Sequence, residues 1–180
     1  MRGGTAMAVP VLAELSALEK TLGLPRSNKF SALAGERLIP ILQTNEGPRL
    51  VGLVTIASYL VKQAKREQLL GTSNEERAAV QQWLEYRVTR LDGRVSGEEA
   101  GGVLRELSAY LQDRVYLAGN RLTLADILAY HGLHQLMAAL PLHEKERYVN
   151  VSRWFSHVQQ YPGVRQHLPS IVFLKNRLYA

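Results

Sequence analysis

The chain has 180 residues, with 22 Lys and Arg against 16 Asp and Glu, a formal net charge of +6 and a pI near 9.7. It contains no cysteine, which excludes disulfides, thiolate zinc sites and cysteine nucleophiles. No segment approaches the roughly 18 consecutive apolar residues of a membrane span, and residues 1–10 lack the apolar run of a signal peptide. We therefore expect a cytoplasmic or nuclear protein without membrane association.

The first part of the chain mixes helical and strand-like patterns. Apolar residues at helical spacing are followed by Gly23 and Pro25, which end a helix. A Gly47–Pro48 turn separates two short strand-like runs. The predicted elements are a helix over 11–22, strands over 29–33, 38–43 and 49–52, and a helix over 53–66.

From residue 73 onward the pattern is helical. Ser73 and Glu76 form the Ser-x-x-Glu pattern of a capping box, in which two side chains satisfy N–H groups at a helix start. After a break at Asp92–Gly93, Ser96 and Glu99 repeat this pattern. The predicted helices are 75–91, an antiparallel partner striped by apolar residues from 103 to 111, one beginning at 124, a short one at 143–147, and 150–161.

The helix that begins at 124 has the most fully specified start. The Thr123 hydroxyl can accept the N–H three residues on, while Asp126 reaches back to the N–H of Thr123, a cap worth about 1 kcal/mol. Leu122 and Ile127 occupy the two positions of a hydrophobic staple. Residues 124–137 are apolar nearly all round, which is typical of a buried helix. We predict a core helix with a fixed entry.

A capping box with a staple at the start of a central buried helix resembles the helical domain of the glutathione S-transferase superfamily. The stretch from Asn150 to Val164 resembles the next helix of that domain with its Pro-terminated end, and residues 39–60 resemble the second half of its thioredoxin-like lobe. The resemblance implies an α+β fold with a reduced thioredoxin-like N-terminal lobe at residues 1–72 and an all-α C-terminal helical bundle at residues 73–180.

The same resemblance argues against catalysis. About ten residues precede the first helix, and they contain no Tyr, Ser or Cys that could hold a glutathione thiolate at the end of a first strand. Pro40 matches the family's cis-proline loop, although a purely structural turn explains it as well. Where the family binds the γ-glutamyl end with an acidic residue or Gln followed by Ser, this chain has Gly52 and Leu53, and leucine cannot hold a carboxylate. We predict no catalytic residue and no cofactor.

Histidine and basic residues are the candidate ligands for metals and nucleic acids in this chain. His131 and His134 share a helix face, but the only nearby carboxylate, Asp126, serves as a cap, so we expect packing and no metal site. Basic clusters at helical spacing are typical of solvated faces, so direct nucleic-acid binding is not expected, although a tRNA-binding auxiliary module remains an alternative. The basic clusters are Lys62, Lys65 and Arg66, and Arg87, Arg90 and Arg94.

The helix over 150–161 carries a polar row beside its buried stripe. Arg153, Ser156, His157 and Gln160 follow each other at helical spacing, an arrangement suited to a hydrogen-bonding contact. Arg153 is the expected anchor, because its planar guanidinium pairs bidentately with carboxylates. An ordinary solvated face is the alternative.

Three further segments sharpen the resemblance, namely 81–89, 150–155 and 175–179. They resemble the transferase-like auxiliary subunits of the multi-aminoacyl-tRNA synthetase complex. The resemblance implies a non-catalytic scaffold that docks to the transferase-like domains of methionyl-tRNA synthetase and glutamyl-prolyl-tRNA synthetase. It also implies a cytoplasmic protein with a possible nuclear pool and a role there with DNA-damage kinases in the tumour-suppressor response.

Two docking faces follow from this resemblance. The family's dimer face would include Lys62, Lys65, Gln81 and Glu85, and a second face would centre on Arg153. An adaptor needs two faces, because one face makes only a dimer. The alternative functions are an active glutathione transferase and the tRNA-binding module.

Overall fold

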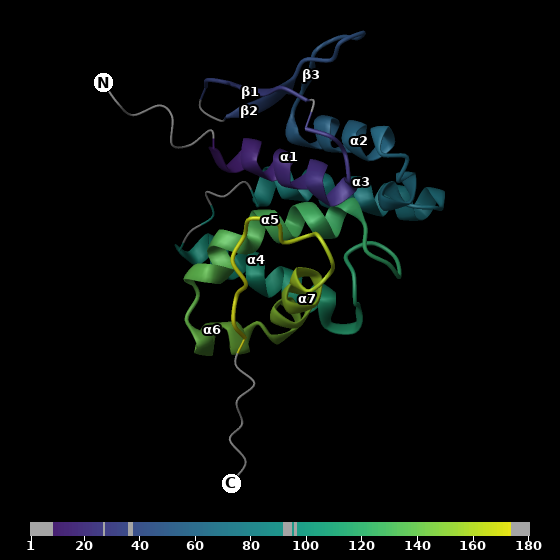
Figure 1. The fold of residues 1–180 in the computed structure, drawn as a ribbon. Helices are drawn as coiled ribbons and strands as arrows, with labels where there is room; N and C mark the ends of the chain where they lie inside the picture. The colour runs from purple at the N-terminus through teal and green to yellow at the C-terminus, as the bar shows by residue number, and fades with distance from the viewer. Residues whose placement is uncertain (1–8, 27, 36–37, 92–94, 96, 174–180) are drawn as a thin grey trace, which may run out of the picture.

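A computed structural model of the chain describes residues 9–26, 28–35, 38–91, 95 and 97–173, with side chains from residue 11 onward. A small sheet lies at one end of the molecule, and the helices that follow it in the chain form a bundle at the other end (Figure 1). The elements are α1 (Val9–Leu22), β1 (Phe30–Leu33), β2 (Ile39–Leu42), β3 (Leu50–Val51), α2 (Leu53–Gln63), the 3-10 helix η1 (Glu67–Leu70), α3 (Asn74–Arg90), α4 (Gly97–Tyr110), the 3-10 helix η2 (Leu111–Asp113), α5 (Leu124–Ala139), α6 (Leu142–Arg147) and α7 (Val149–Gln159).

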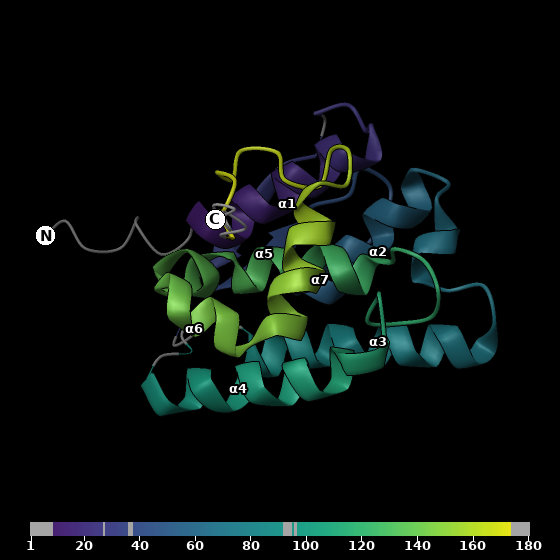
Figure 2. The ribbon, with the colours of Figure 1, turned by 90° about the horizontal axis from the view of Figure 1, so that it is seen from below.

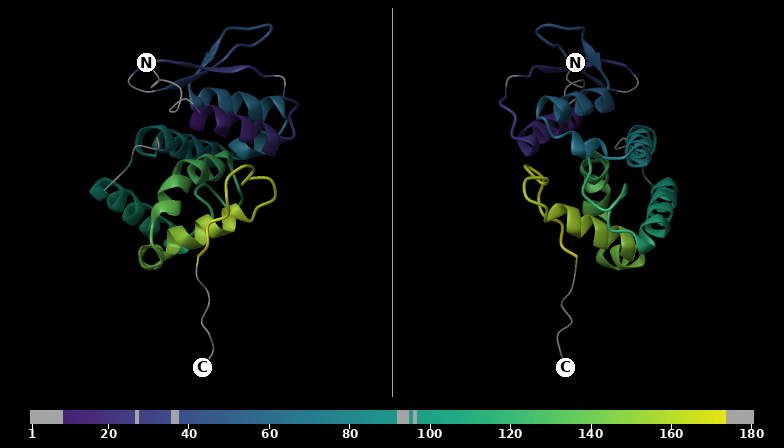
Figure 3. Two further views of the ribbon diagram at one scale, coloured as in Figure 1. Left: turned by 60° about the vertical axis from the view of Figure 1, so that its left-hand side comes forward. Right: turned by 90° about the vertical axis from the view of Figure 1, so that its right-hand side faces the viewer.

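The sheet is antiparallel, with β2 between β1 and β3. Phe30 pairs with Leu42, and Leu42 pairs with Leu50, so these three side chains point to one face and join the hydrophobic core. Helices α1 and α2 both lie on that face, between the sheet and the bundle (Figures 1 and 3). The predicted α+β fold is confirmed, and its core runs without a break from the sheet through α1 and α2 into the bundle.

Pro40 does not adopt the conformation that the family resemblance implied. The peptide bond that precedes it is trans, and Pro40 lies buried inside β2, opposite Ala32. Its carbonyl accepts a hydrogen bond from the N–H of Gly52 at 2.9 Å. Pro40 therefore continues a paired strand, and it lies neither in the cis-proline loop of the resemblance nor in the structural turn given as the alternative.

Helix α2 ends earlier than its sequence pattern predicted. The chain turns at Lys65, whose φ of 56° is left-handed, while its N–H bonds the carbonyl of Lys62 and the N–H of Arg66 bonds that of Val61. This pair of bonds is a Schellman ending, a motif in which glycine usually occupies the left-handed position. Because a lysine occupies it here, no glycine marks the end of the helix after Gln63.

Three capping boxes were predicted, and the one at Ser73 is rearranged. The Ser73 hydroxyl accepts the N–H of Glu76 at 3.1 Å, as expected. The Glu76 carboxylate, however, bonds the N–H and hydroxyl of Thr72 at 2.6 and 2.7 Å, which lowers the pKa of Glu76. The predicted cap at Ser96 and the break at Asp92–Gly93 lie outside the described residues.

The predicted capping box of α5 is present, and its carboxylate does more than close a helix. Asp126 Oδ2 accepts from the N–H of Thr123 at 3.1 Å and lies 3.3 Å from the Thr123 hydroxyl, while Oδ1 accepts from the N–H of Leu117 at 3.0 Å and the indole N–H of Trp154 at 2.9 Å. Asp126 is fully buried. It therefore joins α5 to α7 and to the loop before α5.

The remaining helices pack around α5. Helix α4 runs beside α3 in the opposite direction (Figure 2), as the sequence predicted. The two helices meet through Trp83 and Tyr110, whose rings are 4.7 Å apart, and through a 3.1 Å hydrogen bond from Tyr86 to Glu106. Every helix of the described chain is too short or too polar to cross a bilayer.

Candidate partner-binding faces

The α7 face is organised by Arg153, whose guanidinium is used within the molecule. Its Nη2 donates to the carbonyls of Leu111, at 2.5 Å, and Arg114, at 2.7 Å. These carbonyls lie at the end of α4 and η2, where helices leave acceptors unsatisfied and cations are favoured. Both hydrogens of Nη2 are occupied, so a bidentate pair with a partner carboxylate would first have to break these bonds. Arg153 positions a loop, and only Nε and Nη1 remain for a partner.

The other residues of the predicted row, Ser156, His157 and Gln160, differ in whether they contact the neighbouring loop. His157 Nε2 lies 3.0 Å from the hydroxyl of Tyr116, so this exposed histidine also binds the loop that follows η2. Ser156 is half-buried, and Gln160 is exposed at the end of α7. The sequence therefore placed the four residues on one helix side, but two of them hold the neighbouring loop in place.

Apolar residues on and beside this row were missed by the sequence reasoning. Val149 stands one helical turn before Arg153 and is 61% exposed, and Val115 in the bound loop is 59% exposed. Tyr161 is also exposed after the end of α7. Exposed apolar side chains that gather on one surface are typical of an interaction site, and Tyr and Arg are common anchors of such sites. The available signal was an apolar residue at Val149, off the buried stripe of α7.

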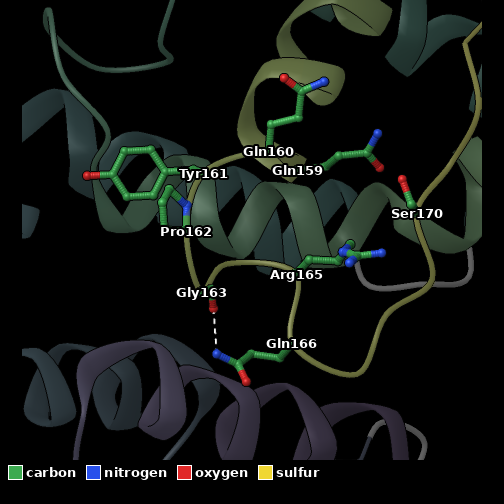
Figure 4. Close-up of a pocket in the computed structure, with 8 residues that line it drawn as sticks. All are labelled: Gln159, Gln160, Tyr161, Pro162, Gly163, Arg165, Gln166 and Ser170. Atoms are coloured by element: carbon green, nitrogen blue, oxygen red, sulfur yellow. Dashed lines mark hydrogen bonds between the residues drawn. The ribbon is translucent and has the colours of Figure 1, made fainter.

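An open cavity of about 400 Å³ lies beyond Gln160 (Figure 4). Figure 4 shows the loop after Pro162 curving back toward Ser170, with Gln166 bonded to the carbonyl of Gly163 at 2.6 Å. Gln159 is buried and uses its whole amide on the backbone of Ile171, so it is closed to a ligand. The cavity adjoins the end of the α7 face at Gln160.

The second predicted face lies on α2, its C-terminal end and α3. Lys62, Lys65, Gln81 and Glu85 are all exposed, and α2 contacts α3 directly. Two members of the predicted basic clusters turn inward instead. Arg66 donates to the carbonyl of Thr21 at 3.3 Å, and Arg87 is buried. Arg94, which was predicted to form a cluster with Arg87 and Arg90, lies outside the described residues.

Gly52 and Leu53, at the start of α2, carry no polar side chain that could bind a glutathione carboxylate. Gly52, the N-cap, has a φ of 99° and no side chain, and Leu53 is buried in the core. Among residues 9–26 the chain forms α1, and its first described strand comes only at Phe30.

The histidines of α5 bind backbone carbonyls. His131 Nε2 lies 3.2 Å from the carbonyl of Val164, and His134 Nε2 lies 2.9 Å from that of Pro169. Both bonds hold the segment after α7 across α5. Within the described residues, no three His, Asp or Glu side chains gather to hold a metal ion.

Burial lowers the pKa of His131 to about 4, from 6.5. As the pH falls below 6.5 the unfolded chain binds the proton first, so this histidine reduces stability toward acid. We expect the wild type to lose about 2 kcal/mol more than His131→Gln between pH 7 and pH 5, in urea unfolding curves. The exposed His143→Gln serves as control and is expected to parallel the wild type. Parallel curves for His131→Gln would contradict the assignment.

Comparisons with known proteins identify relatives in sequence and in fold. The chain is similar to eukaryotic translation elongation factor 1 epsilon-1 of Mus musculus, with 62% identity over 168 residues that cover 93% of this chain and 96% of that protein. A family model described as nuclear-export cofactor Arc1p matches residues 76–162. A crystal structure of a glutathione S-transferase of class Gtt2 from Vibrio parahaemolyticus has a TM-score of 0.69 and 20% identity, covering 91% of this chain and 94% of that one.

A synthetase is also among the relatives. The bifunctional glutamate/proline–tRNA ligase of Mus musculus is 32% identical over 127 residues, which cover 69% of this chain and 8% of that protein. The solved structure shows the fold, and the named relatives show a translation-related auxiliary role. The chain therefore belongs to the family of eukaryotic translation elongation factor 1 epsilon-1.

Proposed function

We propose that this protein is a non-catalytic scaffold of the multi-aminoacyl-tRNA synthetase complex that joins two synthetases through the α2–α3 face and the α7 face. The observation that carries the proposal is the relationship between most of this chain and a small part of a synthetase, the glutamate/proline–tRNA ligase. Two related domains can pair through equivalent faces, as the two subunits of a symmetric dimer do. A second, different face then extends the assembly to another partner.

The proposed partners are glutamyl-prolyl-tRNA synthetase and methionyl-tRNA synthetase. The first is supported by the similarity just described, and the second by the resemblance of residues 81–89 and 150–155 to synthetase-complex subunits. Titration of each isolated transferase-like domain with the full chain would test both. Failure of both domains to bind would contradict the proposal.

The absence of catalysis is part of the proposal. It is supported by Gly52 and Leu53 at the start of α2, where a carboxylate ligand would be needed. Retention on immobilised glutathione together with conjugation of an electrophilic substrate would contradict it. The inward turn of Arg66 and Arg87 weakens the case for a tRNA-binding module.

Location is proposed as cytoplasmic with a possible nuclear pool. The description of the matching family as a nuclear-export cofactor supports movement between the two compartments. An association with DNA-damage kinases rests on the sequence resemblance alone. Imaging of the tagged full chain before and after DNA damage would test both statements.

Arg153→Ala is expected to weaken binding of one synthetase domain about tenfold and to leave the other unchanged. The change releases the carbonyls of Leu111 and Arg114 and loosens the loop that carries Val115. Isothermal titration calorimetry with each domain measures the effect. Lys62→Glu with Lys65→Glu, on the other face, should give the opposite selectivity.

The matched control is Arg105→Ala, an exposed arginine on α4, for which unchanged affinities are expected. If Arg153→Ala and the control bind both domains as the wild type does, the α7 face is not a docking face. If the lysine pair and Arg153 affect the same domain, the two-face arrangement is wrong.

A further inference from the structure

The outer face of the sheet is apolar and open. Register places Leu33 opposite Ile39 and Ile41 opposite Val51, on the side away from Leu42 and the core. Leu33, Ile39 and Val51 are 43%, 41% and 42% exposed. Ile41 lies between them and is itself buried, at 5% exposed, so the open part of the face consists of Leu33, Ile39 and Val51 around it. None of these four side chains belongs to the continuous hydrophobic core. In the described part of the chain, no helix covers this face (Figures 1 and 3).

This pattern departs from that of an ordinary solvated sheet. An antiparallel sheet with helices on one face normally alternates apolar residues inward with polar residues outward. Here Ser31 is the only polar residue at the outer positions of β1, β2 and β3. Exposed aliphatic side chains that gather on one surface are typical of an interaction site. The face therefore has the composition of a covered surface.

One end of the same face is positively charged. Lys29 precedes β1 and Arg49 precedes β3, and both are exposed. Continuing the strand alternation, both side chains belong to the outer face, beside Gln43. The outer positions of the three strands hold no acidic residue. A complementary surface would be apolar along its length and acidic at the end that meets Lys29 and Arg49.

The dimensions of the face favour a short helix. From Lys29 to Leu33 the face extends about 13 Å at ~3.3 Å per residue. About nine residues of α-helix cover the same length at ~1.5 Å per residue. A helix that lies on a sheet buries an apolar stripe and keeps its polar side in water, which is the usual way of covering a sheet face.

We propose that the outer face of β1, β2 and β3 binds an amphipathic helix of a partner protein, with acidic residues at the end that lies over Lys29 and Arg49. This third surface is separate from the α2–α3 and α7 faces, because α1 and α2 lie between the sheet and the bundle. Its loss would leave both proposed synthetase contacts intact. The test of the sheet face can therefore fail while the tests of the synthetase contacts succeed, and the reverse is also true.

The probe is a synthetic 14-residue helical peptide of Leu, Ala and Glu with its glutamates at one end, and a control peptide carries lysines in place of the glutamates. With the full chain, NMR titration should shift the amides of 29–33, 39–43 and 49–51. Leu33→Glu should weaken binding of the peptide at least about tenfold, because the free energy gained by burying a leucine side chain corresponds to more than a tenfold change in affinity. The double variant Lys29→Glu with Arg49→Glu should also weaken binding of the acidic peptide, and the loss of affinity should be larger at low salt than at high salt.

Two control variants separate the face from general effects of charge. Val172→Glu changes an exposed valine away from the sheet, and Lys20→Glu changes an exposed lysine on α1. Both should bind the acidic peptide as the wild type does. Equal binding of the basic peptide, or shifts confined to other residues, would overturn the proposal.

Other occupants give different results. If a second copy covers the face, sedimentation will show a dimer that Leu33→Glu dissociates. If residues 1–8 of the same chain cover it, the peptide will bind only after these residues are deleted. Either outcome would overturn the assignment to a partner helix.

Discussion

Asp126→Ala is expected to lower the free energy of unfolding by about 4 kcal/mol, one of the two largest effects predicted for this chain. The substitution removes the acceptor for the N–H groups of Thr123, Leu117 and Trp154 in one step. A buried donor left without a partner costs about 1–3 kcal/mol. Urea unfolding followed by the fluorescence of the two tryptophans, Trp83 and Trp154, measures the loss.

Burial raises the pKa of Asp126, while its hydrogen-bond donors oppose that rise. Its net contribution is therefore smaller than the sum of its bonds. Thr123→Ala, which removes one cap side chain, should cost only about 1 kcal/mol. If the two substitutions cost the same, Asp126 acts as a helix cap and nothing more.

Part of this site could be read from the sequence and part could not. The Thr123 and Asp126 capping box depends on residues three positions apart, so its pattern is visible in the chain. The bond from Trp154 to Asp126 joins residues 28 positions apart and depends on how α7 crosses α5. Helix existence and order followed from periodicity for the same reason, because helix contacts are local.

The features that the sequence did not show share a physical cause. Arg153 was predicted as the anchor of a partner contact because its row on α7 is visible in the sequence, whereas the carbonyls of Leu111 and Arg114 to which it donates are brought there by packing. The end of α2 was missed because a lysine takes a position where glycine is the usual signal. The open outer sheet face was missed because alternation shows which residues share a face, but not whether a helix covers it.

The second large effect concerns Arg87, which joins α1 to the helical bundle. This residue of α3 is buried and donates to Glu14 of α1 at 2.7 Å and to the carbonyls of Leu128 and Leu91 at 2.8 and 2.6 Å. Gly132 leaves room for it, since a Cβ there would lie 2.5 Å from Arg87 Nε. The guanidinium therefore connects α1 with α3 and α5.

We expect Arg87→Met to lower the free energy of unfolding by about 4 kcal/mol, because it leaves the Glu14 carboxylate buried without its cation. The double variant Arg87→Met with Glu14→Leu should recover most of this loss, since it buries neither charge. Arg90→Met, on the exposed side of the same helix, should change stability by less than about 1 kcal/mol. Urea denaturation of the four proteins completes the comparison.

The pH dependence identifies the mechanism. Burial already raises the pKa of Glu14, and loss of Arg87 removes the charge that opposes this rise. A folded-state carboxyl pKa above the unfolded value means that the folded chain binds the proton first, so stability increases as the pH falls toward 4.5. The cost of Arg87→Met should therefore be smaller at pH 5 than at pH 8. A cost that is the same at both pH values would show that the substitution acts through lost packing and not through the uncompensated carboxylate.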